Sequence, residues 1–128
     1  MIVLDTHTTI WWTQAPEYLG AEAAKAIDSA EILLVPTIVF WEIALLVRKK
    51  RLAIKQDMLV EDWAADVLSI PRVREVPITH EIAIQADALD MHPDPADRFI
   101  VSSALYLSAP LATKDSLLAA LPWLTTIW

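Results

Sequence analysis

The sequence predicts an α/β domain with a mainly parallel central sheet of about five strands and helices on both faces. Two observations support this prediction. Short β-prone runs alternate along the chain with longer segments of helical spacing, which is the pattern of βαβ units. The length of 128 residues is that of one ordinary domain, and the chain contains no repeat or linker. We therefore expect a single domain over residues 1–128.

Five short runs carry the strand-forming residues of the predicted sheet. They are MIVLD (1–5), EILLVP (31–36), VREVPI (73–78), APLAT (109–113) and LTTIW (124–128). Because helical segments separate these runs, consecutive strands are expected to be parallel and joined by right-handed crossovers. Helices then cover such a sheet on both faces.

Residues with helical spacing fill the segments between the strands. These segments are 17–28, 37–50, 56–69, 80–91 and 95–108. A short helix is expected in SLLAAL (116–121), and another just after the first strand, around Trp11 and Trp12. Adjacent helical positions point in different directions, so these two tryptophans cannot enter the same core. Either one of them faces a partner, or both are partly buried against neighbouring helices.

The composition excludes several kinds of site. The chain contains no cysteine, which excludes disulfides, thiolate metal sites and cysteine nucleophiles. Its single glycine, Gly20, excludes a P-loop and a dinucleotide fingerprint, because both need more than one. The longest apolar run, Val35 to Val47, contains an acid and is too short to span a bilayer. With no secretory signal at the N-terminus, a cytoplasmic protein is expected.

Four aspartates lie at boundaries between the predicted elements. Asp5 ends the first strand, and Asp115 follows the fourth. Asp94 and Asp97 open the helix that leads into the fourth strand. In sheets of this class, ligands bind beyond the carboxyl ends of the strands, so these side chains are expected to meet there.

Each of these aspartates also has an ordinary structural interpretation. Asp94 is a good N-cap, and Asp97 in the first turn favours the positive end of the helix dipole. Either Asp115 or Thr113 can cap the short helix that follows them, and Asp5 can be a turn residue at the end of a strand. These interpretations remain open for each residue taken singly.

Glu42 interrupts an otherwise apolar helix. Every other residue from Ile38 to Val47 is apolar, so the predicted helix has no face suited to water. A carboxylate withdrawn from water is costly unless it is paired, protonated or bound to a metal. The first basic residue, Arg48, lies six positions later, beyond the i+4 neighbour. The alternative is that Glu42 lies at an exposed seam or bonds to a backbone group.

Carboxylates that converge at one sheet edge repel each other and tolerate that arrangement only with cations. An all-oxygen site suits Mg²⁺, with Mn²⁺ as a substitute, and fits zinc poorly. Such a site without a nucleophilic side chain indicates metal-assisted hydrolysis of a phosphate ester by water. His7, near Asp5, is either structural or contacts the site, whereas His80 and His92 resemble helix-boundary residues with no assigned role.

The charge distribution bears on a nucleic-acid substrate. A net charge of −7 argues against broad nonspecific binding of nucleic acid. Two bound divalent ions would add four charges and change −7 to −3, which weakens that objection. Half of the ten basic residues lie in one short segment, either as a phosphate-contacting patch or as a solvated helix end. They are Arg48, Lys49, Lys50, Arg51 and Lys55.

In order and spacing, four motifs resemble the PIN-domain ribonucleases, specifically the VapC-type toxins of toxin–antitoxin pairs. They are LDTHTTIWW, WEIA, DPADRFI and TKD, and the likeness covers essentially the whole chain. The resemblance implies a PIN-like fold and a Mg²⁺- or Mn²⁺-dependent endoribonuclease. The implied acidic cluster is Asp5, Glu42, Asp97 and Asp115. It also implies an RNA substrate, a homodimer, and inhibition by a small cognate antitoxin that lies in a groove.

Two further positions take their interpretation from this resemblance. Asp94 matches the first Asp of the Asp-Pro-Xaa-Asp-Arg stretch, and we interpret it as a helix cap first and a site neighbour second. Thr113 falls where the family often has Ser or Thr near the metal. Whether Asp94 contacts a metal directly stays open.

Three other functions compete with this one. A non-catalytic dimer of the same fold would act only as a binding or regulatory module. A phosphatase of the haloacid-dehalogenase type needs a second Asp two residues after the first, where this chain has His7. A DNA nuclease of the related flap or exonuclease type would share the acids, but such chains are usually larger. The nuclease toxin therefore remains the preferred hypothesis.

Overall fold

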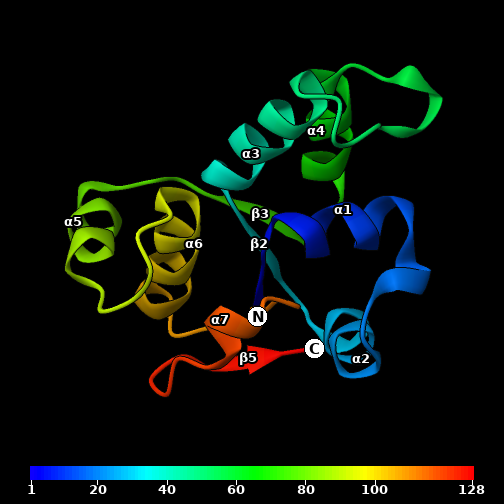
Figure 1. The fold of residues 1–128 in the computed structure, drawn as a ribbon. Helices are drawn as coiled ribbons and strands as arrows, with labels where there is room; N and C mark the ends of the chain where they lie inside the picture. The colour runs from blue at the N-terminus through cyan, green and yellow to red at the C-terminus, as the bar shows by residue number, and fades with distance from the viewer.

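The computed structural model describes residues 1–128 and contains a five-stranded, wholly parallel sheet (Figure 1). The strands are β1 (Ile2–Leu4), β2 (Leu33–Pro36), β3 (Val73–Val76), β4 (Leu111–Ala112) and β5 (Thr126–Ile127). Their order across the sheet is β3-β2-β1-β4-β5. The predicted fold class is confirmed, and each strand lies inside its predicted run.

Seven helices and two 3₁₀ turns connect the strands. The helices are α1 (Thr6–Gln14), α2 (Ala21–Ser29), α3 (Thr37–Arg48), α4 (Val60–Ser69), α5 (His80–Ala88), α6 (Pro95–Tyr106) and α7 (Ser116–Ala119). The turns are η1 (Pro16–Tyr18) and η2 (Lys55–Asp57). The predicted helix 56–69 is wrong at its start, because Gln56 and Asp57 have positive φ angles of 64° and 50°. A right-handed helix cannot continue through such residues.

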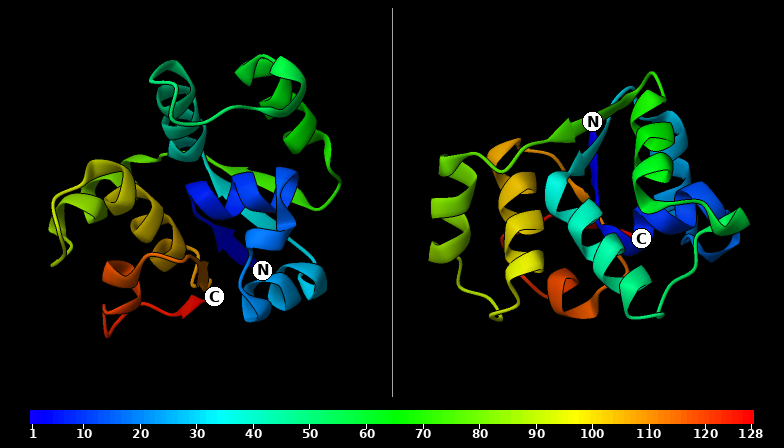
Figure 2. Two further views of the ribbon diagram at one scale, coloured as in Figure 1. Left: turned by 45° about the vertical axis from the view of Figure 1, so that its right-hand side comes forward. Right: turned by 90° about the horizontal axis from the view of Figure 1, so that it is seen from above.

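The helices form two layers, one on each face of the sheet. Helices α1, α2 and α4 lie on one side of the strands, and α5 and α6 lie on the other (Figures 1 and 2). Right-handed crossovers explain this division, because the chain moves one way from β1 to β3 and then returns across the sheet to β4. The point where the direction reverses lies between β1 and β4, and α3 contacts both α1 and α6.

Burial follows the position of each strand in the sheet. Every residue of β1, β2 and β4 is buried, as expected for inner strands covered on both faces. The edge strand β3 instead buries only Val73 and Val76 and exposes Arg74 and Glu75. The core therefore lies along the central strands, whose carboxyl ends are buried.

The two adjacent tryptophans are both partly buried and point in different directions. Trp11 packs against the rings of His7, Tyr18 and Trp128, with centroid separations of 5.4, 6.0 and 5.7 Å. Trp12 lies instead near the guanidinium of Arg72, which is 5.8 Å from its ring. The structure thus favours the second alternative, in which both pack against neighbouring elements.

Helix α3 is less buried than its composition suggests. Only Val39 and Ile43 are buried, while Trp41 is 57% exposed. The expectation of a helix without a water-facing side is therefore wrong. Apolar composition does not by itself enforce burial, because folding of one chain can leave apolar surface uncovered. No helix in the structure has the length and apolar character needed to cross a membrane.

Candidate active site

A polar cavity of about 330 Å³ lies beyond the carboxyl ends of β1 and β4, where the order in which the chain adds strands to the sheet reverses. This is the place where ligands bind in open α/β sheets. All the predicted acids line it, together with predicted neighbours and two other side chains. The lining residues are Asp5, Thr6, His7, Glu42, Asp94, Asp97, Ile100 and Asp115. Side chains distant in sequence therefore converge as predicted.

Asp5 and Asp115 serve both as helix caps and as cavity residues. The backbone N–H of Thr8 donates to Asp5 Oδ1 at 2.8 Å, and that of Leu117 donates to Asp115 Oδ1 at 2.8 Å. In each case the cap uses one carboxylate oxygen and leaves Oδ2 for the cavity. The two interpretations of these residues are therefore compatible, since the caps fix the carboxylates that line the site.

Thr113 acts behind the cavity and does not line it. Its side chain is buried, and Oγ1 accepts a hydrogen bond from the backbone N–H of Asp115 at 3.1 Å. The structure thus gives Thr113 a role in orienting the turn that carries Asp115. It does not place Thr113 among the groups that face a ligand.

Asp94 differs from its predicted role. It occupies the N-cap position of α6, but its side chain makes no capping hydrogen bond and lines the cavity instead. The interpretation of Asp94 as a helix cap first is therefore wrong. Pro95 at the first helical position has no N–H to satisfy, which lowers the need for a side-chain cap.

Arg98 fixes the segment between α5 and α6 and makes no ion pair with the adjacent Asp97. Its guanidinium donates to backbone carbonyls over 2.7–3.2 Å. The acceptors are the carbonyls of Ala86, Asp87, Leu89, Met91 and His92. This planar fork satisfies carbonyls that the end of α5 would otherwise leave unpaired.

We expect Arg98→Lys to lower the free energy of unfolding by about 2–4 kcal/mol, because an ammonium cannot reproduce the planar fork. Urea denaturation measures this loss. Arg74→Lys is the matched control, since Arg74 bonds only to carbonyls within its own segment, those of Pro71 and Val73. An equal loss in both variants would contradict the assigned role.

Glu42 reaches the cavity from α3 and is half-buried. Burial raises the pKa of its carboxyl, and the nearby charges of Asp94 and Asp5 raise it further. The hydroxyl of Thr6 donates to Glu42 Oε1, which opposes this rise without cancelling it. Thr6 was not identified from the sequence, although its position directly after Asp5 was a usable signal.

Asp97 is the most perturbed acid in the protein. Burial raises the pKa of its carboxyl to about 7, and the negative charges of Asp94, Glu42 and Asp115 contribute in the same direction. Burial of the carboxyl and the neighbouring negative charges both disfavour its ionised form. Strongly perturbed acids in a cavity are characteristic of functional sites.

The chain supplies no Lys or Arg to neutralise these acids. The two ion-pair contacts, His80 with Glu81 and His92 with Asp97, involve only histidines. The three arginines outside the basic run, Arg72, Arg74 and Arg98, all donate to backbone carbonyls. A cluster of carboxylate oxygens without a cationic partner fits a hard divalent cation from solution.

His92 approaches the acids, contrary to its interpretation as a helix-boundary residue without a role. Its Nε2 lies 3.4 Å from Asp97 Oδ2. Three atoms that could bind a metal lie within 4.8 Å of one another, one each from His92, Asp97 and Asp115. Asp5 and Glu42 are outside this tight group. The signal in the sequence was the nearness of His92 to Asp94 in HPDPAD.

The other predicted neighbours lie at or away from the cavity. His7 lines it and is exposed. The basic residues do not line the cavity. Arg48 to Arg51 are exposed around the end of α3, and Lys55 begins η2. The structure therefore separates the basic run from the lining of the acidic cavity.

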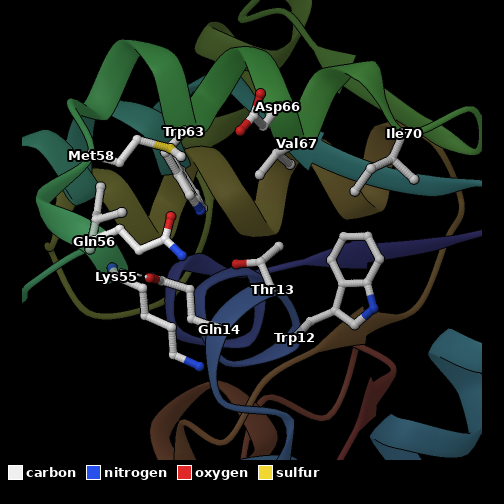
Figure 3. Close-up of a pocket in the computed structure, with 11 residues that line it drawn as sticks. Trp12, Thr13, Gln14, Lys55, Gln56, Met58, Trp63, Asp66, Val67 and Ile70 are labelled. Atoms are coloured by element: carbon white, nitrogen blue, oxygen red, sulfur yellow. Dashed lines mark hydrogen bonds between the residues drawn. The ribbon is translucent and has the colours of Figure 1, made fainter.

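A second, mostly apolar groove of about 480 Å³ lies between α1 and α4. Figure 3 shows Trp12, Thr13 and Gln14 from α1 facing Trp63 and Val67 from α4. Met58 and Ile70 add apolar surface, and Lys55 and Gln56 lie at the α1 side with Gln14. The backbone N–H of Lys55 donates to Gln14 Oε1 at 2.7 Å, which ties η2 to α1. The groove contains none of the clustered acids.

Comparisons with known proteins place this chain and its fold among relatives. Residues 2–124 match the family model of the PIN domain. The chain is 34% identical to "Ribonuclease VapC22" of Mycobacterium tuberculosis (strain ATCC 25618 / H37Rv), covering 99% of this chain and 98% of that protein.

Two solved structures share the fold at lower identity. VapBC2 of Rickettsia felis, bound to a DNA fragment from its promoter, has a TM-score of 0.71 at 17% identity and covers 98% of this chain and 97% of the other. A toxin–antitoxin complex from Klebsiella pneumoniae has a TM-score of 0.66 at 19% identity, with coverages of 95% and 93%. Together with the family match and the cavity at the predicted sheet edge, these likenesses lead to one conclusion: the chain belongs to the PIN-domain family.

Proposed function

We propose that this protein is a divalent-metal-dependent endoribonuclease and the toxin of a toxin–antitoxin pair. The observation that carries this proposal is the cavity in which Asp5, Glu42, Asp97 and Asp115 converge without a Lys or Arg partner. The similarity to a ribonuclease over 99% of the chain supports RNA as the substrate. The cofactor in this proposal is Mg²⁺ or Mn²⁺, because all four side chains offer carboxylate oxygens.

The residues of the chain would divide the work of hydrolysis. Asp97 and Asp115, whose ligand-capable atoms lie within 4.8 Å of each other, would hold an ion. Asp5 and Asp115 keep fixed orientations because backbone N–H groups bind their Oδ1 atoms. When bound, a divalent ion lowers the pKa of a water molecule and neutralises charge on the phosphate.

Among the acids not assigned to holding the ion, Glu42 is the group best suited to accept a proton. Its pKa is raised, so it takes a proton more readily than an ordinary carboxylate near neutral pH. The hydroxyl of Thr6 occupies Oε1, and Oε2 makes no hydrogen bond to the chain. We therefore assign proton acceptance from the attacking water to Glu42 Oε2, with Thr6 holding the carboxylate in place.

The proposal includes a small antitoxin as partner. The Rickettsia felis and Klebsiella pneumoniae neighbours are toxin–antitoxin assemblies, which supports a partner of this kind. The apolar groove between α1 and α4 offers Trp12, Met58 and Ile70 as partly exposed contacts. An amphipathic antitoxin segment would bury these side chains, as helices do when they bind in apolar grooves.

A homodimer is also part of the proposal. Several large apolar side chains remain exposed on one chain, including Trp41, Ile84 and Tyr106 at 57, 69 and 50%. Surface of this kind is typical of interaction sites, and association with a second copy would cover it.

RNA binding is assigned to the basic run from Arg48 to Arg51 and to Lys55. These side chains are exposed, and no carboxylate of the chain pairs with them. Their place outside the cavity suits contacts with phosphates at some distance from the cleaved bond.

Removal of metal tests the proposed reaction. We expect the purified chain, freed of partner, to cleave total RNA with added Mg²⁺ or Mn²⁺ and to lose this activity in EDTA. Gel analysis of 5′-labelled RNA follows the products, and readdition of Mn²⁺ should restore them. Cleavage that persists in EDTA would refute the metal-dependent reaction, and no cleavage with either ion would favour a non-catalytic binding module.

A further inference from the structure

We propose that His92 is a positioning residue of the acidic cavity, which donates a hydrogen bond from Nε2 to Asp97 Oδ2 and so directs Oδ1 of that carboxylate toward the ion. The inference rests on the proposed function, because it assumes that the cavity binds a divalent cation. It adds to the site a residue to which the sequence pattern assigned no role.

The contact between His92 and Asp97 carries the first step of this inference. His92 Nε2 is buried and is the one buried side-chain nitrogen or oxygen in the protein without a hydrogen-bond partner. It lies 3.4 Å from Asp97 Oδ2, so a small shift and rotation of the imidazole would give an ordinary N–H···O hydrogen bond. A buried polar atom without a partner is costly, and Asp97 is the acceptor within reach.

The direction of approach separates positioning from direct binding of metal. His92 does not line the cavity, whereas Asp97 does. We therefore place the imidazole beside the carboxylate and outside the cavity lining, as supporting residues are placed around carboxylate ligands, with one ring nitrogen still within 4.8 Å of an oxygen of Asp115. Of the group formed by His92, Asp97 and Asp115, Asp97 Oδ1 and the Asp115 carboxylate are then the atoms that face the cavity.

The backbone holds the imidazole at this place. Arg98 Nε donates to the carbonyl of His92 at 3.1 Å, and Nη2 donates to the carbonyl of Met91 at 2.7 Å. Pro93 follows directly and restricts the backbone of His92 further. The adjacent Arg98 thus orders the loop that brings His92 against Asp97, and the three residues act as one unit.

Metal affinity, measured without RNA, tests this role. Mn²⁺ titration of the whole purified chain, followed by the electron paramagnetic resonance of free Mn²⁺, gives the dissociation constant. We expect His92→Ala to weaken Mn²⁺ binding about 10–100-fold, as loss of supporting partners does at metal sites. His92→Gln should bind within a few-fold of wild type, because its amide can donate from a similar position. His80→Ala is the matched control, since His80 is 81% exposed.

Pulsed electron paramagnetic resonance of bound Mn²⁺ separates positioning from coordination. In His7→Ala, which removes the histidine that lines the cavity, we expect no coupling from a directly bound nitrogen. Such a coupling would overturn the inference, because His92 would then be a ligand. This measurement does not depend on whether His92→Ala folds.

The remaining outcomes separate the inference from the proposed function. Wild-type protein that binds no Mn²⁺ would overturn the proposed metal site itself. Wild-type binding that His92→Ala retains in full would overturn only the role of His92. A His92→Gln variant as weak as His92→Ala, with both folded by circular dichroism, would overturn the hydrogen bond as the cause.

Discussion

Replacement of Asp97 by Asn is expected to reduce RNA cleavage by at least about 10³-fold, equivalent to about 4 kcal/mol of transition-state stabilisation. The amide keeps the size of the side chain but removes the negative charge that the proposed ion requires. Asp97 lies in the first turn of α6 and lines the cavity, so few rearrangements can replace it. Single-turnover cleavage of labelled RNA in Mn²⁺ measures the change.

Asp28→Asn is the matched control for this variant. Asp28 is an exposed aspartate on α2, outside the cavity, and its loss should leave cleavage unchanged. Comparable activity of Asp97→Asn and wild type, in preparations shown to be free of host nuclease, would contradict the assignment of Asp97.

The Asp97→Asn variant is also expected to stabilise the metal-free fold at alkaline pH. The pKa of Asp97 is about 7 in the folded chain against an ordinary value of 3.8, so the folded state binds more protons between these limits. Stability from this group is therefore greatest at low pH and falls as pH rises through 7. At pH 8 in EDTA, we expect the free energy of unfolding of Asp97→Asn to exceed that of wild type by about 1–2 kcal/mol, which allows for screening by solvent.

Mn²⁺ affinity is expected to fall as the pH is lowered below about 7. The carboxylate of Asp97 must lose its proton before it can bind a cation, and its pKa is raised to about 7. Each pH unit below that value should weaken binding by up to about tenfold, and affinity should level off above it. The raised pKa of Glu42 acts in the same direction.

Isothermal titration with Mn²⁺ between pH 5.5 and 8.5 measures this dependence. Asp97→Asn should bind weakly at every pH and lose the portion of the slope that Asp97 causes. An affinity for wild type that stays constant down to pH 5.5 would show that Asp97 does not bind the ion through a carboxylate with this pKa.

The fold was predictable because the strands and helices depend on local patterns. The apolar runs that became β1 and β2 specify strands buried on both faces, and alternation with helices specifies parallel pairing. The boundaries were less predictable. The positive φ angles of Gln56 and Asp57 occur in η2, which a hydrogen bond from the Lys55 N–H ties to Gln14 of α1, and no local pattern records that long-range contact.

The sequence by itself determined which acids meet, because Asp5 and Asp115 follow strands whose carboxyl ends share one edge of a parallel sheet. Only the tertiary structure decided how those acids are supported. Asp94 lines the cavity without capping its helix, Arg98 binds carbonyls of the preceding loop, and His92 lies against Asp97.

The physical reason lies in the range of the interactions. Strand ends and helix starts follow from backbone preferences over a few residues, so they can be predicted from short stretches of sequence. The direction of an individual side chain instead depends on the complete set of neighbours that compete for its hydrogen bonds. That competition exists only once the chain has folded.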